Sequence, residues 1–131
     1  MRESLAGSRY AKSLIALSIE KNELDAIYSD MVLVSETIEQ SKDLDVLLKS
    51  PVVKTDKKQE VLTAIFGKNT TELTKQFLLL ISSRNREALI GDIASAFVRQ
   101  YKVIKKIVVT EITSAVKLAD DQKKQILHLL N

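Results

Sequence analysis

The chain has 131 residues, of which 45% are hydrophobic and 28% are charged, and its formal net charge is +3. These proportions are typical of a folded soluble domain and exclude an intrinsically disordered chain. The chain has no cysteine, which excludes disulfides, thiolate metal sites and cysteine nucleophiles. Its 20 basic residues are interleaved with 17 acidic ones, unlike the clustered charge of most nucleic-acid binders.

One proline and three glycines leave little material for tight turns, so the sequence favours long helices. Apolar residues at helical spacing predict a first helix over residues 3–20 and a second over residues 23–40. We expect Asn22 to cap the second helix, because its side chain can accept hydrogen bonds from free amides. No apolar run reaches the roughly 20 residues of a membrane span, and the first residues lack a signal-peptide core, so we expect a soluble, cytoplasmic protein.

The middle of the chain is predicted to contain three shorter helices. The first, residues 42–49, must end before Pro51, because proline disfavours a helical conformation in the residue before it. The second, residues 56–66, is followed by Gly67, which we expect in the left-handed conformation at the helix end. The third begins near residue 70, and Arg84-Asn85 separates it from the helix that follows.

The longest apolar pattern of the sequence runs from residue 73 to residue 104. In its second half, large apolar side chains recur at steps of three and four residues, which predicts one buried helix face. In its first half, Phe77-Leu78-Leu79-Leu80-Ile81 is apolar on every side. A helix of this kind either lies at the centre of a bundle or presents one side to a partner.

Residues 107–116 are rich in β-branched side chains and predict a β-strand. Residues 121–131 predict a last helix. A lone strand has nothing to pair with, so three alternatives remain open for the region after residue 106: it is disordered, it extends the helical bundle, or it is exchanged with a neighbour. The predicted fold class is all-α: a six-helix bundle followed by a strand and a helix from an incomplete α/β domain.

No arrangement of residues in the sequence indicates catalysis. His128 is the single histidine and has no metal-ligand spacing around it, and no glycine-rich phosphate loop occurs. The lysine clusters Lys54/Lys57/Lys58 and Lys102/Lys105/Lys106 favour solvated helix faces. The alternative is a helical nucleic-acid-binding module that uses these lysine-rich faces, in which case binding would weaken steeply with salt.

Several short stretches, taken in order, are similar to one known family. They are Arg9-Tyr10-Ala11-Lys12-Ser13-Leu14, Leu48-x-x-Pro51 with Ile65-Phe66, Phe77–Ile81 with Asn85-Arg86 and Ile93-x-x-x-Phe97, and finally Val108-x-Thr110-x-Ile112-x-Ser114-Ala115-x-x-Leu118 with Asp121-Gln122. The ordered set resembles the delta subunit of F-type ATP synthases, called the oligomycin-sensitivity-conferring protein in mitochondria. Two features depart from the family pattern: Gly91 stands where many members have proline, and the family's chain continues beyond this point.

The resemblance implies a non-catalytic stator subunit without cofactor, metal, nucleic acid or small-molecule substrate. Residues 1–106 would be the bundle that binds the N-terminal helix of an α subunit, and residues 107–131 would start the C-terminal domain that binds the b subunits of the peripheral stalk. Such a subunit is a monomer in isolation. It lies peripherally on the cytoplasmic side of the bacterial inner membrane, which it reaches only through the complex.

The family pattern also implies a groove between the first and fifth helices, into which an amphipathic helix would fit. Its expected lining consists of Tyr10, Ser13, Leu14 and Leu17 on one wall and Phe77, Leu80, Ile81 and Arg84 on the other. Core packing is the competing interpretation for Leu14, Phe77 and Ile81.

Overall fold

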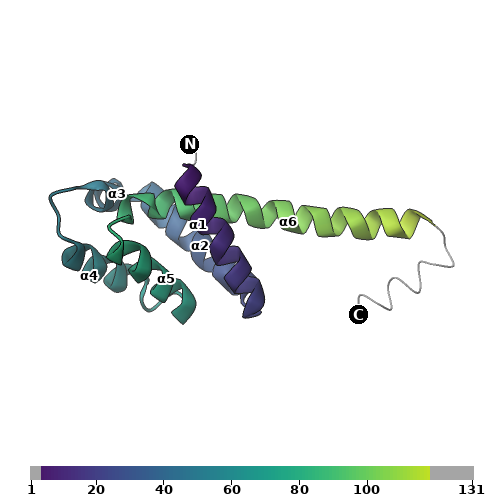
Figure 1. Ribbon diagram of the computed structural model, residues 1–131, viewed down its shortest axis with the longest axis horizontal. Coiled ribbons are helices and arrows are strands. Elements are labelled where there is room, and N and C mark those ends of the chain that lie inside the picture. The colour runs from purple at the N-terminus through teal and green to yellow at the C-terminus, as the bar shows by residue number, and fades with distance from the viewer. Residues whose placement is uncertain (1–3, 119–131) are drawn as a thin grey trace. The chain divides into compact units, whose positions relative to one another are not determined.

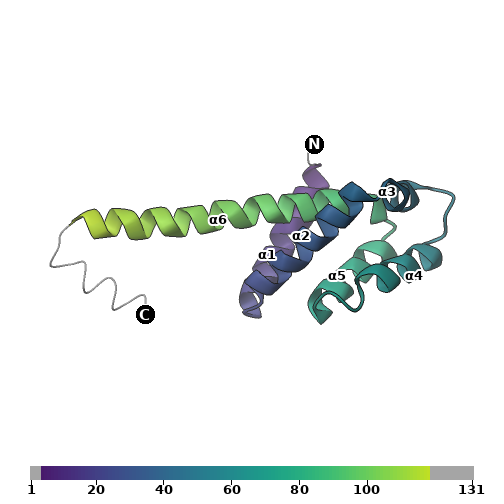
Figure 2. The same cartoon turned by 180° about the vertical axis from the view of Figure 1, so that it is seen from behind.

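The computed structural model describes residues 4–118 and the side chains of residues 4–107, and the described residues form helices only (Figures 1 and 2). In chain order the elements are α1 (Leu5–Glu20), α2 (Leu24–Gln40), α3 (Lys42–Lys49), α4 (Thr55–Phe66), α5 (Glu72–Ser83), the 3-10 turn η1 (Glu87–Leu89) and α6 (Ile90–Leu118). The chain divides into two compact units, residues 1–100 and residues 101–131.

The first unit is a helical bundle, as predicted. Its core is made by the side chains that recur at three- and four-residue steps, and the largest of those with less than 2% exposure are Phe66, Phe97, Leu14, Ile27, Met31, Leu62, Ile81, Ile90 and Ile93. They come from five of the six helices. In Figure 1, α1, α2 and α5 are inclined in the same direction, with α1 and α5 nearer the viewer than α2.

The strand predicted over residues 107–116 is wrong. Helix α6 runs without a break from Ile90 to Leu118. β-propensity is largely a preference for packing on a sheet, and no other strand exists within residues 4–118 to provide one. Extending an existing helix adds one hydrogen bond for each residue fixed, whereas a new strand needs a partner. The predicted helix over residues 121–131 and His128 lie outside the described residues.

Two predictions about helix ends are also wrong. Asn22 has a φ of 56° and no capping role, because α2 begins after Glu23 without a side-chain cap. Asparagine is one of the few residues that tolerates this left-handed conformation. Gly67 has a φ of −61°, and a side chain there would collide with the carbonyl oxygen of Thr63. The predicted break after α5 is confirmed, since Asn85 has a φ of 59°.

The second unit includes the part of α6 that begins at Tyr101. Its described side chains are mainly exposed: Val103 and Ile107 retain 48% and 52% of their accessible surface. The Lys105 amine lies 5.4 Å from the centre of the Tyr101 ring, a cation–π contact between neighbouring turns of the helix. Between residues 4 and 118, no helix is both long enough and apolar enough to cross a membrane.

Candidate functional site

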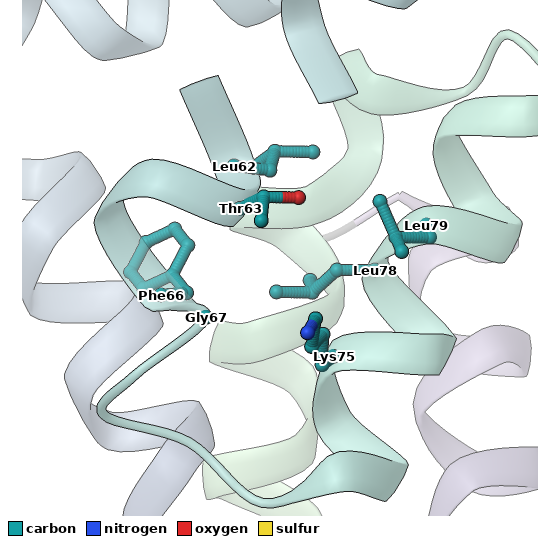
Figure 3. Close-up of a pocket in the computed structure, with 7 residues that line it drawn as sticks. All are labelled: Leu62, Thr63, Phe66, Gly67, Lys75, Leu78 and Leu79. Atoms are coloured by element: carbon teal, nitrogen blue, oxygen red, sulfur yellow. The ribbon is translucent and has the colours of Figure 1, made fainter. Parts of the chain in front are cut away.

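Neither of two hollows in the bundle has the features of a catalytic pocket. The smaller one lies between α4 and α5 (Figure 3) and encloses about 10 Å³, which is space for at most a single water molecule. Its lining, drawn as sticks in Figure 3, is Leu62, Thr63, Phe66, Gly67, Lys75, Leu78 and Leu79. Figure 3 shows apolar side chains from the two helices facing each other across it, so this hollow is a gap in their packing.

The larger hollow is a cleft of about 530 Å³ between α2, α3, η1 and the start of α6. The residues that line it include both acidic and basic side chains. Among them, the Lys49 amine and the Asp45 carboxylate form an ion pair at 3.2 Å. The hydroxyls of Ser35 and Ser95 lie 3.4 Å apart in it. Within the described part of the chain, no group of three or more His, Cys, Asp or Glu side chains could hold a metal ion. None of the eight predicted groove residues lines either hollow.

The eight predicted groove residues fall into three classes of burial. Leu14 and Ile81, with 1% and 0% exposure, belong to the core. Tyr10, Leu17 and Phe77 are half-buried, and Ser13, Leu80 and Arg84 are exposed. Leu80 retains 47% of its surface, which is high for a leucine on a helix that packs in a bundle. Six of the eight are therefore accessible to a partner.

On α1, the accessible predicted residues lie on one stripe. Tyr10, Ser13 and Leu17 are preceded by Ala6, which was not among the predicted residues. The four follow one another at steps of four, three and four residues, so they share one side of the helix. None of them is buried. The core side of α1 is made by other residues, Gly7, Ala11, Leu14, Ile15 and Ser18. The stripe thus lies on a flank of α1, beside its core side.

On α5, a second stripe has the same spacing. Leu73, Phe77, Leu80 and Arg84 recur at steps of four, three and four residues, and none is buried. Leu73 was missed by the sequence analysis, although its position four residues before Phe77 is the signal that would have identified it. The opposite flank of α5 carries Lys75 and Leu79, which face α4. The stripe is therefore directed away from α4.

The two stripes lie on helices that run in opposite directions on one side of the bundle. A Cβ atom on Gly7 would come within 2.9 Å of the Asp92 Cβ, so the start of α1 lies against the start of α6. The end of α5 is joined to the start of α6 by only six residues, 84–89, the last three of which form η1. The start of α1 and the end of α5 are thus at the same end of the bundle. Both helices face the viewer in Figure 1 and lie on the far side in Figure 2. We refer to the eight residues of the two stripes, Ala6, Tyr10, Ser13, Leu17, Leu73, Phe77, Leu80 and Arg84, as the α1/α5 face.

Helix α5 is fixed at its start by a buried carboxylate. Asp30 of α2 is 7% exposed, and its Oδ2 accepts hydrogen bonds from the Thr71 backbone amide at 2.9 Å, the Thr71 hydroxyl at 2.8 Å and the Thr74 hydroxyl at 2.7 Å. The Thr71 hydroxyl also caps α5 by accepting from the Thr74 amide at 3.3 Å. A carboxylate at a helix N-terminus is favoured by the free amides and the helix dipole. These bonds hold the start of α5 against α2.

The other end of α5 is fixed by a buried ion pair. The Lys58 amine lies 3.7 Å from the Glu87 carboxylate, and the two side chains are only 8% and 4% exposed. Lys58 also donates to the carbonyl oxygen of Leu48 at 3.2 Å, and the Ser82 hydroxyl donates to Glu87 at 3.2 Å. For Lys58, the prediction of a solvated lysine face is wrong. Because both ends of α5 are held by buried polar contacts, its accessible stripe is presented by a rigid element.

Comparison with known proteins identifies the family. Residues 6–131 match the family model described as ATP synthase delta (OSCP) subunit. The chain is 36% identical to ATP synthase subunit delta of Cytophaga hutchinsonii over 123 residues, which cover 94% of this chain and 68% of that protein. It is 31% identical to ATP synthase subunit delta of Chlorobaculum parvum over 131 residues, which cover all of this chain and 72% of that protein. The chain therefore belongs to the ATP synthase delta (OSCP) subunit family, whose members are non-catalytic subunits of that complex.

Proposed function

We propose that this protein is a stator subunit that links the catalytic head of the F-type ATP synthase to its peripheral stalk. In this role residues 1–106 bind the N-terminal helix of an α subunit, and residues 107–131 belong to the part that binds the b subunits. The protein then prevents the head from turning with the rotor, so that rotation is coupled to ATP synthesis. It works on the cytoplasmic side of the bacterial inner membrane, peripherally and within the complex.

The observation that carries the proposal is the α1/α5 face. Two helices present side chains with the same four-three-four spacing, and large apolar groups such as Leu80 remain accessible between polar ones. An amphipathic helix binds by placing its own apolar residues, at the same spacing, against such a surface. Because members of the delta (OSCP) family are subunits of the ATP synthase complex, the partner we propose is another subunit of that complex.

The rigidity of α5 supports the same role. A connection under mechanical load needs a surface that is already in its binding conformation, because ordering a mobile surface consumes part of the binding free energy. The buried contacts of Asp30 at one end of α5 and of Glu87 at the other provide such a surface. No chemical step is required of the protein.

Calorimetric titration of the full chain with a peptide of about twenty residues from the N-terminus of the cognate α subunit tests the proposal. Saturable one-to-one binding that persists at high salt is the expected result, because burial of apolar side chains, unlike phosphate contacts, depends little on ionic strength. A scrambled peptide of the same composition is the control. Absence of binding by the folded chain, or equal binding of the scrambled peptide, would refute the proposed interaction.

A further inference from the structure

The buried polar side chains of the bundle are concentrated at one boundary. Six polar or charged residues are buried in the described part of the chain, and one of them, Ser18, bonds within its own helix to the carbonyl oxygen of Leu14. The other five lie where α4 and α5 meet the remainder of the bundle. They are Asp30, Lys58, Thr74, Ser82 and Glu87.

Helices α4 and α5 form a helical hairpin, residues 55–83, with two exposed connections to the rest of the chain. Helix α4 packs mainly on α5, which lies between α4 and α2 (Figures 1 and 2). The chain enters the hairpin through residues 50–54, where Val52 retains 87% of its surface. It leaves through the exposed residues 84–86, where Asn85 has a φ of 59°. Neither connection is helical, and hinges are short segments of this kind that absorb changes in backbone angles.

The contacts that hold the hairpin to the rest of the bundle include a charged side chain at each end of α5. At its start, Asp30 of α2 accepts hydrogen bonds from Thr71 and Thr74. At its end, Glu87 of η1 accepts from Ser82 and pairs with Lys58 of α4. The buried residues of α4 recur at steps of four, and the first of them is the charged Lys58 where an apolar residue would continue the stripe.

A polar boundary of this kind separates at lower cost than an apolar one. Water replaces the partners of hydrogen-bonding groups when they part, so the net contribution of each bond is small. A buried ion pair likewise contributes about as much to stability as an uncharged pair of the same size. Apolar contacts, by contrast, lose free energy in proportion to the area that is exposed. The edge of the hairpin is therefore where the bundle divides most readily.

We infer that the α4–α5 hairpin opens and closes as one unit along this boundary, while α1, α2 and the start of α6 remain folded. The structure shows the closed state. Because α5 carries half of the α1/α5 face, opening divides the face and closing completes it. This control of the face rests on the proposed function, whereas the opening itself does not. A partner that contacts both helices binds only the closed state, so its binding holds the hairpin shut.

Native-state hydrogen exchange of the full chain, measured at urea concentrations below the global transition, tests the inference. The hydrogen-bonded amides of residues 55–83 should exchange through one common opening, at least about tenfold faster than the slowest amides of α1 and α2. This opening should depend less steeply on urea than global unfolding, because it exposes less surface. Equal rates and equal urea dependence in the hairpin and in α1 and α2 would overturn the inference.

Three substitutions separate opening of the hairpin from global unfolding. Gly7→Ala perturbs the contact between α1 and α6, which opening leaves intact, so it should accelerate exchange in α1 and α2 by at least about fivefold and leave residues 55–83 unchanged. Glu87→Gln removes a contact of the boundary and should accelerate exchange in the hairpin by about a hundredfold or more. Lys57→Met is the matched control, because it breaks an exposed ion pair and should change exchange in the hairpin by less than about fivefold.

Two outcomes among these variants would overturn the inference. One is acceleration of the hairpin by Gly7→Ala to the same extent as α1 and α2, and the other is an effect of Glu87→Gln no larger than that of the Lys57→Met control. If Gly7→Ala leaves every amide unchanged, the urea dependence in the unsubstituted protein decides.

The cognate α-subunit peptide separates the device from the proposed function. Added in excess over its dissociation constant, it should slow exchange in residues 55–83 in proportion to its concentration. If the hairpin opens as a unit in the free chain and the peptide does not slow it, the control of the face is refuted together with the proposed function. If the peptide binds while the hairpin exchanges only through global unfolding, the proposed function stands and the device is refuted.

Discussion

The buried ion pair between Lys58 and Glu87 allows a quantitative test of how the bundle holds α5 in place. Its Nζ–Oε2 distance is 3.7 Å, and both side chains are more than nine-tenths buried. Removing one member of such a pair leaves a charge in the interior without compensation, which costs about 3–5 kcal/mol. For a bundle of this size each kcal/mol lowers the melting temperature by about 4–8 °C. Lys58→Met should therefore lower it by at least about 12 °C.

Urea denaturation followed by far-UV circular dichroism measures this cost. Glu87→Gln should be similarly destabilising, because it leaves the Lys58 ammonium unpaired. The double variant should recover most of the loss, since a buried ion pair replaced as a whole by uncharged residues is often neutral in stability. Lys57→Met is the matched control, because Lys57 pairs with Glu60 at 3.9 Å while both side chains remain largely exposed. It should change the free energy of unfolding by no more than about 1 kcal/mol.

The result that would refute this reasoning is specific. If Lys58→Met costs no more than Lys57→Met, the buried pair does not stabilise the bundle. If the double variant loses as much as the two single variants together, the two side chains are not energetically coupled.

Three further predictions concern single residues. Asp30→Ala should lower the free energy of unfolding by about 1–3 kcal/mol, because the start of α5 loses its buried acceptor; a loss below about 0.5 kcal/mol in the same urea assay would contradict this. Gly7→Ala should lower the free energy of unfolding by about 1–3 kcal/mol, since its new Cβ would lie 2.9 Å from a carbon of α6. Gly91→Ala, whose Cβ would lie 3.5 Å from its nearest neighbour, should be neutral or stabilise the protein by up to about 1 kcal/mol. Equal effects of the two substitutions would be inconsistent with close packing at Gly7. Leu80→Ala should leave stability nearly unchanged but weaken binding of the α-subunit peptide. Tyr10→Ala should weaken binding of the same peptide by about 2 kcal/mol or more, as measured by calorimetry. Unchanged affinity in both variants would argue against the α1/α5 face as the binding surface.

Hydrophobic periodicity predicted the helices of the bundle because each helix must bury one side. The boundaries of α2 and α3 and the buried faces around Phe66 and Phe97 agree with that pattern. The strand over residues 107–116 was mispredicted from its β-branched composition, although the lack of a partner strand had left an extension of the helical bundle open as an alternative. Helix α6, which begins at Ile90, continues through these β-branched residues. Extension of the helix already formed outweighed the local preference of these residues for a strand.

The site was only partly predictable. The resemblance to the family grouped Tyr10, Ser13 and Leu17 with Leu14 and Ile81, and neither that resemblance nor periodicity could separate the last two, which belong to the core, from the accessible flank. The contacts that fix α5 could not be found from the sequence, since a lysine in a charged stretch normally indicates solvent. Lys58 is buried because Glu87, 29 positions later, folds back against it.

Mapping the binding surface on the full chain by NMR tests the central claim most directly. The ¹⁵N-labelled protein would be titrated with the α-subunit peptide, and changes in amide chemical shift would be assigned to residues. The account predicts that the largest changes fall on α1 and α5, on and beside Tyr10, Leu17, Phe77 and Leu80. Changes concentrated instead around the cleft between α2, α3 and the start of α6, or on the lysine-bearing face of α4, would contradict it.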